Sequence, residues 1–447
     1  MGLMQFNGLR SRFNGRNNLP FGPIFNAVRG AFRPSLLFDF ANNQSLVSSA
    51  GGVVTLTFTR ASDQTYFNSA GVLQTAATDV AAFDYDPTTL APLGLSLWEA
   101  RTNSLRNNTM VGAVAGTPGT NPNNWTITTP QDGVDKSIVA VGTTNGVSTI
   151  DVRLNGTSST GGASNLVLFE SNTQITAANL DTWTGSIFAA LVAGSFTNVS
   201  LLSLNIRYND SGGSLLTSQN VSLLGLGATL QRITNTFAAN NASIARVNLQ
   251  LVYDFTNSAA VDFTLRIGMP QLELGAFATP VIATTAAAAT RAAPVCSTTN
   301  LSWFNSLEGT FVSRASVGSV AANERNVYSV TDSTDANRIH FRANAPGDTQ
   351  YVVVTSSVAQ AALAGATYSA SYTPINTAVA YKSDDFAISA NGGAVSADTS
   401  GTVPTGLTTL YVGNRNNIST TFINGWLKYL AYYPSRLPNA TFQGLSA

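Results

Sequence analysis

Acidic side chains are scarce in this sequence, and their spacing does not predict a catalytic pair of carboxylates. A glycosidase needs two carboxylates about 5–10 Å apart, and the chain has only five Glu residues. Glu324, Asp332 and Asp335 are close in sequence, but no Glu-x-Asp-x-x-Glu motif occurs. We interpret these three residues as solvated turn carboxylates and predict that the protein is not an enzyme.

Acidic and amide side chains also cluster in three places that have the composition of a calcium site. Calcium takes about six to eight oxygen ligands. The clusters are Asp384 and Asp385 with Asn391, Asp332 with Asp335 and Asn337, and Asp84 with Asp86. Each offers only a few ligands, and Asp and Asn in loops commonly bond their own backbone. We therefore predict no metal site and no cofactor.

The chain has one His and one Cys, which excludes zinc sites built from His and Cys clusters and a disulfide within the chain. His340 lies in the strand-like segment NRIHFRA, where alternation puts Ile339 inward and His340 on the opposite face. We expect His340 to face solvent or a partner. Cys296 follows Pro294 with no His nearby in the sequence, so we expect no nucleophile there.

Two polar loop segments have the residue types of a glycan site, in which aromatic faces stack on sugars and polar side chains bond hydroxyl groups. The first contains Tyr411, Asn414, Arg415, Asn416 and Asn417, and the second contains Tyr381, Lys382, Asp384 and Asp385. Both lie at the ends of predicted strands, where sandwich proteins often bind ligands. We predict glycan contact at these loops, with ordinary turns or a subunit interface as the alternatives.

The elements that position these residues are predicted to be strands. Charged residues make up only 10% of the 447 residues, against about 25% in typical proteins. Gly, Asn, Ser and Thr take their place and favour turns and polar strand faces over long helices. We predict an all-β fold with several sandwiches in series. The net charge is zero, which disfavours a nucleic-acid binder.

The sequence has no apolar stretch of about 18 residues and no signal-peptide core at its N-terminus. We expect no membrane insertion and no export by a leader. The protein is expected to stay in the cytoplasm or to leave it by lysis or within a particle.

Composition and periodicity divide the chain into five segments. They are an extended arm at 1–34, a small β module or collar at 35–109, a β-sandwich at 110–275, an Ala/Thr-rich linker at 276–300 and a second β-sandwich at 301–447. Within 93–105 one short stretch has the composition of a helix. Asn391-Gly392 predicts a type I′ turn.

The arm at 1–34 combines regularly supplied Phe residues with Arg and has no acidic residue. It follows neither a helical nor a strand period, so it cannot form a core by itself. We predict that it orders on a partner, with Phe filling pockets and Arg pairing with acids; a disordered tail is the alternative. The proposed docking residues are Phe6, Arg10, Arg12, Phe13, Arg16, Phe21, Phe25, Arg29 and Phe32.

The segment 57–103, which ends in LWEARTN, resembles a recurrent module of tailed-bacteriophage virion proteins of the tail-fibre and head-fibre type. The segment 268–294, with QLELGAFAT and TRAAP, resembles the end of their central domain, although Met269 and Pro270 depart from the common pattern. The resemblance implies a carbohydrate-binding-module-like sandwich at 110–275.

The C-terminal segment is similar to concanavalin A-like (LamG-type) lectin sandwiches. The similarity rests on LYVGN at 410–414 and on FINGWLKYLAYYPSRLPNATFQGL at 422–445. In that fold Gly425 would open the last strand, Tyr433, Arg436 and Leu437 would close it, and a short helix would follow.

The resemblance implies a structural virion protein. Its arm would dock on capsid, portal, adaptor or tail proteins, and its C-terminal domain would contact host-surface polysaccharide, with a homotrimer as the common assembly. It would be assembled in the host cytoplasm, be released by lysis and reside in the virion. The alternative is a head-surface fibre, decoration or connector that binds no receptor.

Overall fold

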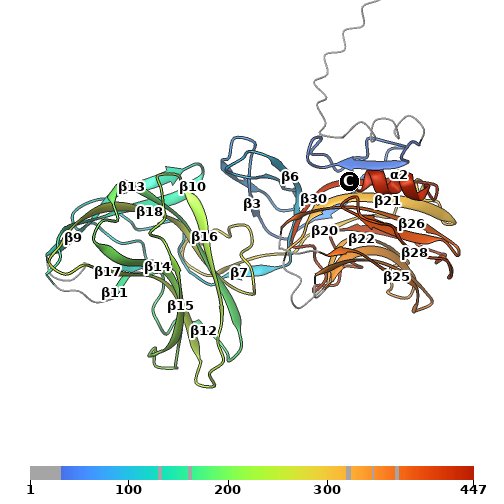
Figure 1. Ribbon diagram of the computed structural model, residues 1–447. Coiled ribbons are helices and arrows are strands. Elements are labelled where there is room, and N and C mark those ends of the chain that lie inside the picture. Colours follow the sequence, from blue (N-terminus) through green and yellow to red (C-terminus); the bar gives the residue numbers. More distant parts are fainter. Residues whose placement is uncertain (1–31, 129–132, 160–163, 319–323, 345–346, 368–371) are drawn as a thin grey trace, which may run out of the picture.

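A computed structural model describes residues 32–128, 133–159, 164–318, 324–344, 347–367 and 372–447. These residues form two β-sandwiches joined by short ribbons (Figure 1), with one helix, α2 (Asn439–Leu445). The all-β prediction is confirmed. All but one of the proposed docking residues lie outside the described part. Phe32 is half-buried and packs on the protein's own apolar cluster beneath α2, with Val312 and Phe442.

The central sandwich is built from two antiparallel sheets. One sheet has the order β16 (Gln231–Ala238), β13 (Thr182–Ser195), β18 (Ala260–Leu274), β10 (Val147–Thr157) and β9 (Val134–Thr144). The other has β15 (Leu215–Ser222), β14 (Val199–Asn209), β17 (Arg246–Phe255), β11 (Ser164–Leu168) and β8 (Thr126–Ile127), with β12 (Ile175–Thr176) beside β17. Alternating apolar residues such as Leu204 and Leu249 fill the space between the sheets.

The C-terminal sandwich pairs a larger sheet with a seven-stranded one. The larger sheet has the order β28 (Ser396–Asp398), β27 (Phe386–Ala390), β26 (Pro374–Lys382), β21 (Glu308–Ser316), β30 (Gly425–Tyr433), β6 (Pro92–Leu97) and β5 (Phe83–Tyr85), and β1 (Leu36–Asp39) also pairs with β30. The second has β2 (Thr57–Thr59), β20 (Val295–Thr298), β29 (Thr409–Val412), β22 (Arg325–Thr331), β23 (Arg338–Asn344), β24 (Asp348–Thr355) and β25 (Val358–Thr367).

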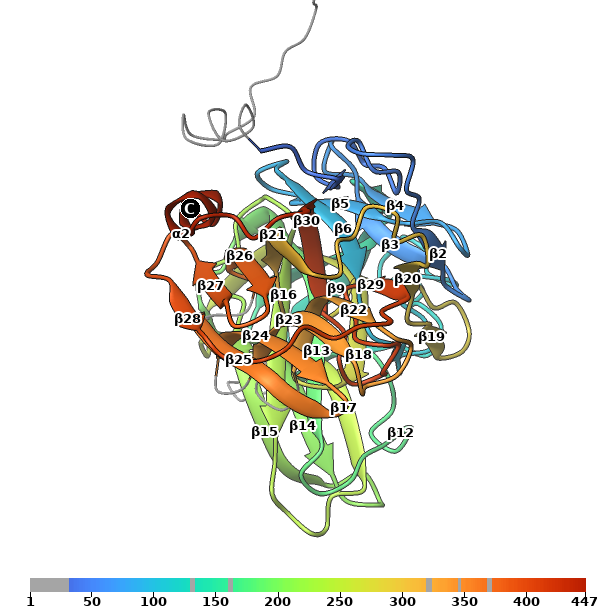
Figure 2. The same cartoon turned by 90° about the vertical axis from the view of Figure 1, so that its right-hand side faces the viewer.

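Segments 35–109 and 276–300 do not form the separate module and linker that we expected. Strands β1 and β6 pair with β30. Strand β2 pairs with β20, and β20 in turn pairs with β29. In Figure 2 the blue N-terminal strands lie beside β20 and β30 of the C-terminal sandwich. Residues from 36 to 97 therefore complete a core whose other half lies some 200 residues or more further along the chain, as Phe38 and Leu430 show.

Two short ribbons connect the sandwiches. They are β3 (Gln64–Phe67) with β4 (Leu73–Ala76), and β7 (Arg101–Asn103) with β19 (Ala289–Arg291). The prediction of a helix within 93–105 is wrong. Leu95 and Leu97 belong to strand β6, and their side chains point into the C-terminal core. No helix in the described residues is long and apolar enough to span a membrane.

The Asn391-Gly392 turn is confirmed. Both residues have positive φ, 50° and 69°, and the Gly393 amide donates to the Ala390 carbonyl at 2.9 Å. This is the geometry of a type I′ turn. A short helix follows the last strand, as the resemblance implied, and its Phe442 and Leu445 are buried.

Candidate functional site

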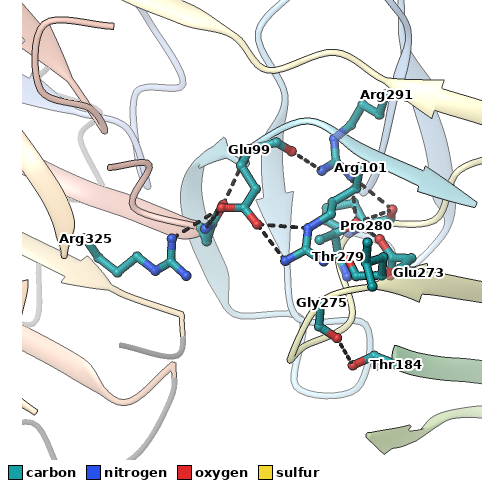
Figure 3. Close-up of polar contacts among 11 residues, drawn as sticks. Glu99, Arg101, Thr184, Glu273, Gly275, Thr279, Pro280, Arg291 and Arg325 are labelled. Atoms are coloured by element: carbon teal, nitrogen blue, oxygen red, sulfur yellow. Dashed lines mark hydrogen bonds and ion pairs between the residues drawn. The ribbon is translucent and has the colours of Figure 1, made fainter. Parts of the chain in front are cut away.

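The carboxylate of Glu99 lies at the junction of the two sandwiches and joins them (Figure 3). It accepts hydrogen bonds from Arg101 Nε at 2.9 Å and from Asn424 Nδ2 at 2.7 Å, and it pairs with Arg325 Nη1 at 3.3 Å. The Glu99 amide in turn donates to Asn424 Oδ1 at 2.7 Å. The Glu99 side chain thus contacts residues on β7, on β22 and in the loop before β30.

Arg291 extends this network into the central sandwich. Its Nη2 donates to the Glu99 carbonyl at 2.8 Å, and its Nη1 donates to Thr279 Oγ1 at 2.9 Å. Thr279 donates from its amide and its hydroxyl to Glu273, which is fully buried. Burial lowers the pKa of Arg291 to about 10 although Glu273 opposes the shift. The motifs LWEARTN, QLELGA and TRAA therefore meet here, and they hold the junction together.

A cleft of about 560 Å³ opens beside this junction. Its walls come from β3 and β5, from the β9–β10 turn and β16 of the central sandwich, and from the start of β30. The cleft therefore forms only when the N-terminal strands β3 and β5, the central sandwich and the C-terminal sandwich are assembled together. Its aromatic and charged lining residues are Tyr66, Phe67, Asp84, Tyr85, Asp86, Trp98, Phe188, Arg232, Tyr372 and Trp426.

Three aromatic rings gather at one end of the cleft. The centroid of Trp426 lies 5.2 Å from that of Trp98 and 5.4 Å from that of Tyr372, and Trp98 lies 5.9 Å from Tyr372. Trp98 is buried, whereas Trp426 and Tyr372 are partly exposed. The edge-to-face contacts fix the rings and leave apolar surface open to a ligand.

The Asp84 carboxylate lies next to these rings. Trp426 Nε1 donates to its Oδ2 at 2.9 Å, and the amides of Phe67 and Tyr85 donate to its Oδ1 at 2.7 and 3.0 Å. Asp84 is 5% exposed. Burial raises the pKa of Asp84 to about 6, although these hydrogen bonds favour the ionised form.

Arg232 supplies a positive charge to the lining of the cleft. It donates to the Thr279 carbonyl at 2.8 Å and to Ser186 Oγ at 2.9 Å, and its guanidinium lies 5.8 Å from the centroid of the Phe188 ring. Burial lowers the pKa of Arg232. The guanidinium is therefore held in place by groups of the central sandwich.

The arrangement suits binding rather than proton transfer. Both oxygens of Asp84 already accept hydrogen bonds from protein donors, and Asp86 Oδ1 accepts from the amides of Thr88 and Thr89 in its own turn. Half-exposed rings beside fixed polar groups form a surface on which a saccharide can stack and hydrogen-bond. Within the described ranges no three His, Cys, Asp or Glu residues are grouped as metal ligands.

The first loop predicted to contact glycan is largely engaged inside the protein. Asn414 is buried and its side chain bonds the amide and carbonyl of Ile418. Arg415 pairs with Glu324 at 3.1 Å. Asn416 and Asn417 have positive φ, as a tight turn requires, and Tyr411 is partly exposed on β29. None of these residues lines the cleft, and glycan contact at the exposed ones stays a prediction.

In the second predicted loop, the prediction that Tyr381 contacts glycan is wrong. Its ring is fully buried in the C-terminal core and its hydroxyl lies 2.7 Å from that of Tyr432. Strand alternation alone did not reveal that both faces of β26 are covered. Asp384 remains in an exposed turn, where its Oδ1 accepts from the Gly401 amide, and Asp385 pairs with Arg436.

The other acidic clusters act locally. Asp332 accepts from the Thr334 amide and from Asn337 Nδ2, as in an Asx turn. Glu324 pairs with Arg342 and Arg415. These hydrogen bonds and ion pairs engage the carboxylates that we predicted to be solvated turn residues.

His340 is buried, which corrects the expectation that it faces solvent or a partner. It does lie on the face opposite Ile339, as alternation predicted, but the loop after β29 covers that face. Ser329, which lies across from His340, donates from its hydroxyl to the Asn414 carbonyl at 3.1 Å. Cys296 is likewise buried, on β20 rather than in a linker.

His340 is expected to remain neutral in the folded protein at pH 5–8. Burial, followed by the charges of Arg338 and Arg415, holds the pKa of His340 well below its usual range. Its contribution to stability is complete above the unfolded pKa of about 6.5 and is lost as pH falls below it, by about 1.4 kcal/mol per pH unit. Because the chain has one His, a single imidazole NMR signal reports the titration. A folded-state pKa near 6.5 would contradict this prediction.

The stability term is measured by comparing the wild type with His340→Phe in chemical denaturation. The variant is expected to lose less stability than the wild type between pH 6.5 and 5. Asp84 acts in the opposite sense, because its raised pKa makes the folded state less stable as pH rises from about 4 to 6. The difference between the two proteins isolates the His340 term.

Sequence reasoning missed the cleft residues Trp98, Tyr372, Trp426 and Arg232, and treated Asp84 only as a loose calcium ligand. Asp84 and Trp426 lie 342 positions apart in the chain. Trp98 and Trp426 stand in the motifs LWEARTN and FINGWLKYL, but nothing in those motifs connects the two rings. A local signal existed only for Asp84, an acid between two aromatic residues in FDY.

No protein-family model and no curated protein matches this chain. Among solved structures, the CBM40 of the Ruminococcus gnavus IT-sialidase is 14% identical, with a TM-score of 0.28, over 32% of this chain and 84% of that one. Domains LG4-5 of the mouse laminin α1 chain are 12% identical, with a TM-score of 0.23, over 67% and 92%. A tail fibre protein from an E. coli phage is 10% identical, with a TM-score of 0.16, over 75% and 39%. None reaches a TM-score of 0.5, so the functional argument rests on the cleft.

Proposed function

We propose that this protein is a non-catalytic carbohydrate-binding protein and that the junction cleft holds the saccharide. The observation that carries the proposal is the group of rings around Trp426 beside Asp84 in a cleft of about 560 Å³. That volume lies within the range of about 300–1,000 Å³ for small-molecule sites. The C-terminal sandwich contributes Trp426 and Tyr372, so it takes part in binding through the junction rather than through its loops alone.

We further propose that the protein serves as a fibre-like appendage of a bacteriophage particle. The resemblance of LWEARTN, QLELGA and TRAA to virion proteins supports this assignment, as does the Phe- and Arg-rich composition of 1–34. In this role the arm docks on capsid, portal, adaptor or tail proteins, and a homotrimer displays several clefts. Several weak sites on one particle gain avidity when they engage one surface together.

A second candidate is a head-surface fibre, decoration or connector that binds no receptor. The engagement of Asn414 and Arg415 inside the protein favours this alternative, because these residues were the predicted receptor contacts. In this case the sandwiches act as a scaffold and the cleft has no ligand.

A glycan array distinguishes the two candidates. The full chain is expected to bind a subset of saccharides, and Trp426→Ala and Tyr66→Ala are each expected to weaken that binding about tenfold or more, since each removes a partly exposed ring from the cleft. Tyr411→Ala is the matched control, because Tyr411 is a partly exposed aromatic residue outside the cleft. Thermal unfolding of each variant verifies its fold.

Loss of binding in Tyr411→Ala with retention in both cleft variants would transfer the site to the predicted loop. The absence of saccharide binding by the native oligomer would favour the scaffold.

A further inference from the structure

The further inference concerns the charge of the ligand and rests on the proposed function of the cleft. Asp84 stands apart from the other buried carboxylates of the described chain. Asp151 pairs with Arg266 at 2.7 Å and Glu170 pairs with Arg106 at 2.8 Å. Glu273 lies in the field of Arg232 and Arg291. Asp84 and Glu273 are the two buried carboxylates for which no cation lies within ion-pair distance among the described residues. Of these two, only Asp84 also has no arginine or lysine acting on it at longer range.

The three donors to Asp84 are neutral. They are the amides of Phe67 and Tyr85 and the indole Nε1 of Trp426. Hydrogen bonds from neutral groups only partly offset the loss of hydration of a buried carboxylate. A positively charged ligand group at this point would therefore gain an interaction that the protein itself leaves unused.

The aromatic rings favour the same charge. The hydrogen bond from Trp426 holds its indole against the carboxylate, and Trp98 and Tyr372 lie within 6 Å of that indole, centroid to centroid. A cation is attracted to the face of an aromatic ring, most strongly to Trp. Carboxylate and rings thus act together on a positive group.

We infer that the cleft recognises a saccharide that carries a free ammonium group, such as an amino sugar whose nitrogen is not acetylated. The ammonium lies against Asp84 and the rings, and the sugar ring stacks on Trp426. A neutral or N-acetylated sugar of the same skeleton lacks the charge and leaves the carboxylate unpaired.

The titratable and charged groups that line the cleft around Asp84 are Asp86, Tyr66, Tyr85, Tyr372 and Arg232. Of these, Asp86 is engaged by its own turn and Arg232 by Thr279 and Ser186. Because burial raises the pKa of Asp84 to about 6, ammonium binding is expected to weaken as pH falls below 6. A ligand held by stacking alone would show no such dependence.

The test compares two oligosaccharides that differ only at the nitrogen, which is a free amine in one and acetylated in the other, with the full chain in calorimetric titration at pH 6.5. Glucosamine tetramer is expected to bind at least tenfold more tightly than N-acetylglucosamine tetramer. Asp84→Asn, which keeps the shape and the acceptor for the two backbone amides, is expected to reduce this preference to less than twofold. Asp86→Asn is the matched control: it lines the same cleft and removes the same charge, and it is expected to keep the preference.

Equal binding of the two tetramers by the wild type, which needs no variant, would overturn the inference. Persistence of the preference in Asp84→Asn would do the same. If choline chloride binds as tightly as the glucosamine tetramer, the site takes an ammonium without a sugar and the saccharide part is wrong. Binding of only neutral or acidic saccharides on the array would remove this inference and leave the proposed function standing, whereas binding of no saccharide would remove the proposed function itself.

Discussion

Residues 301–447 expressed alone are expected to yield no stably folded domain. In the full chain their core is completed by eight buried apolar residues from the N-terminal part. These are Leu36, Phe38, Phe40, Val54, Leu56, Phe58, Leu95 and Leu97. At about 1.5 kcal/mol or more each, their loss removes on the order of 12 kcal/mol, which is comparable with the whole stability of a typical domain, about 5–15 kcal/mol. Strand β30 would also lose its partners β1 and β6.

Near-UV circular dichroism and thermal unfolding measure this effect. Residues 101–285 form the control fragment, because every member of the central core lies between Leu105 and Leu272. The control is expected to unfold cooperatively, and 301–447 is expected to give no cooperative transition until residues 32–109 are supplied in the same chain. A cooperative transition of 301–447 alone would restore the domain boundary that the sequence had suggested.

Replacement of Arg291 by Met is expected to destabilise the protein by about 3–5 kcal/mol, the usual effect of removing one partner from a buried charged network. Arg291 is 1% exposed and donates to Thr279, Pro280 and Glu99. Without it, the fully buried Glu273 loses a facing charge and three oxygen atoms lose a donor. The junction between the sandwiches is therefore expected to loosen first.

Chemical denaturation measures this difference against Arg153→Met. Arg153 also pairs with an acid, Asp262, at 2.9 Å, but both side chains are about half exposed. Exposed pairs are worth about 0–1 kcal/mol, so the control variant is expected to change stability little. The prediction is wrong if the two variants lose equal amounts. Arg291→Met combined with Glu273→Gln is expected to recover part of the loss, because the second change removes the unpaired charge.

Local patterns in the sequence were sufficient to predict the strands and one turn. Alternation in segments such as RVNLQLVYDF and GTFVSRAS predicts strands that match β17 and β21. Most residues on both faces of these strands are nevertheless buried. Asn391-Gly392 specified its turn, since both residues accept positive φ. These are interactions between near neighbours in the chain.

Local patterns could not predict burial that depends on distant segments. Local patterns predicted that Tyr381 and His340 are exposed. Aromatic packing covers Tyr381, and the loop after β29 covers His340. The same limit applies to the cleft, where Asp84, Trp98 and Trp426 meet only because β6 pairs with β30. No spacing rule connects residues more than 300 positions apart.

The sequence by itself thus determined the all-β class, the positions of many strands and one turn. That Glu99, Glu273 and Arg291 join the sandwiches emerged only from the contacts between them. Only the tertiary structure decided which strands share a sheet and which side chains form the cleft. The physical reason is that strand pairing and burial are long-range: the partner that satisfies a backbone hydrogen bond or covers a ring can lie anywhere along the chain.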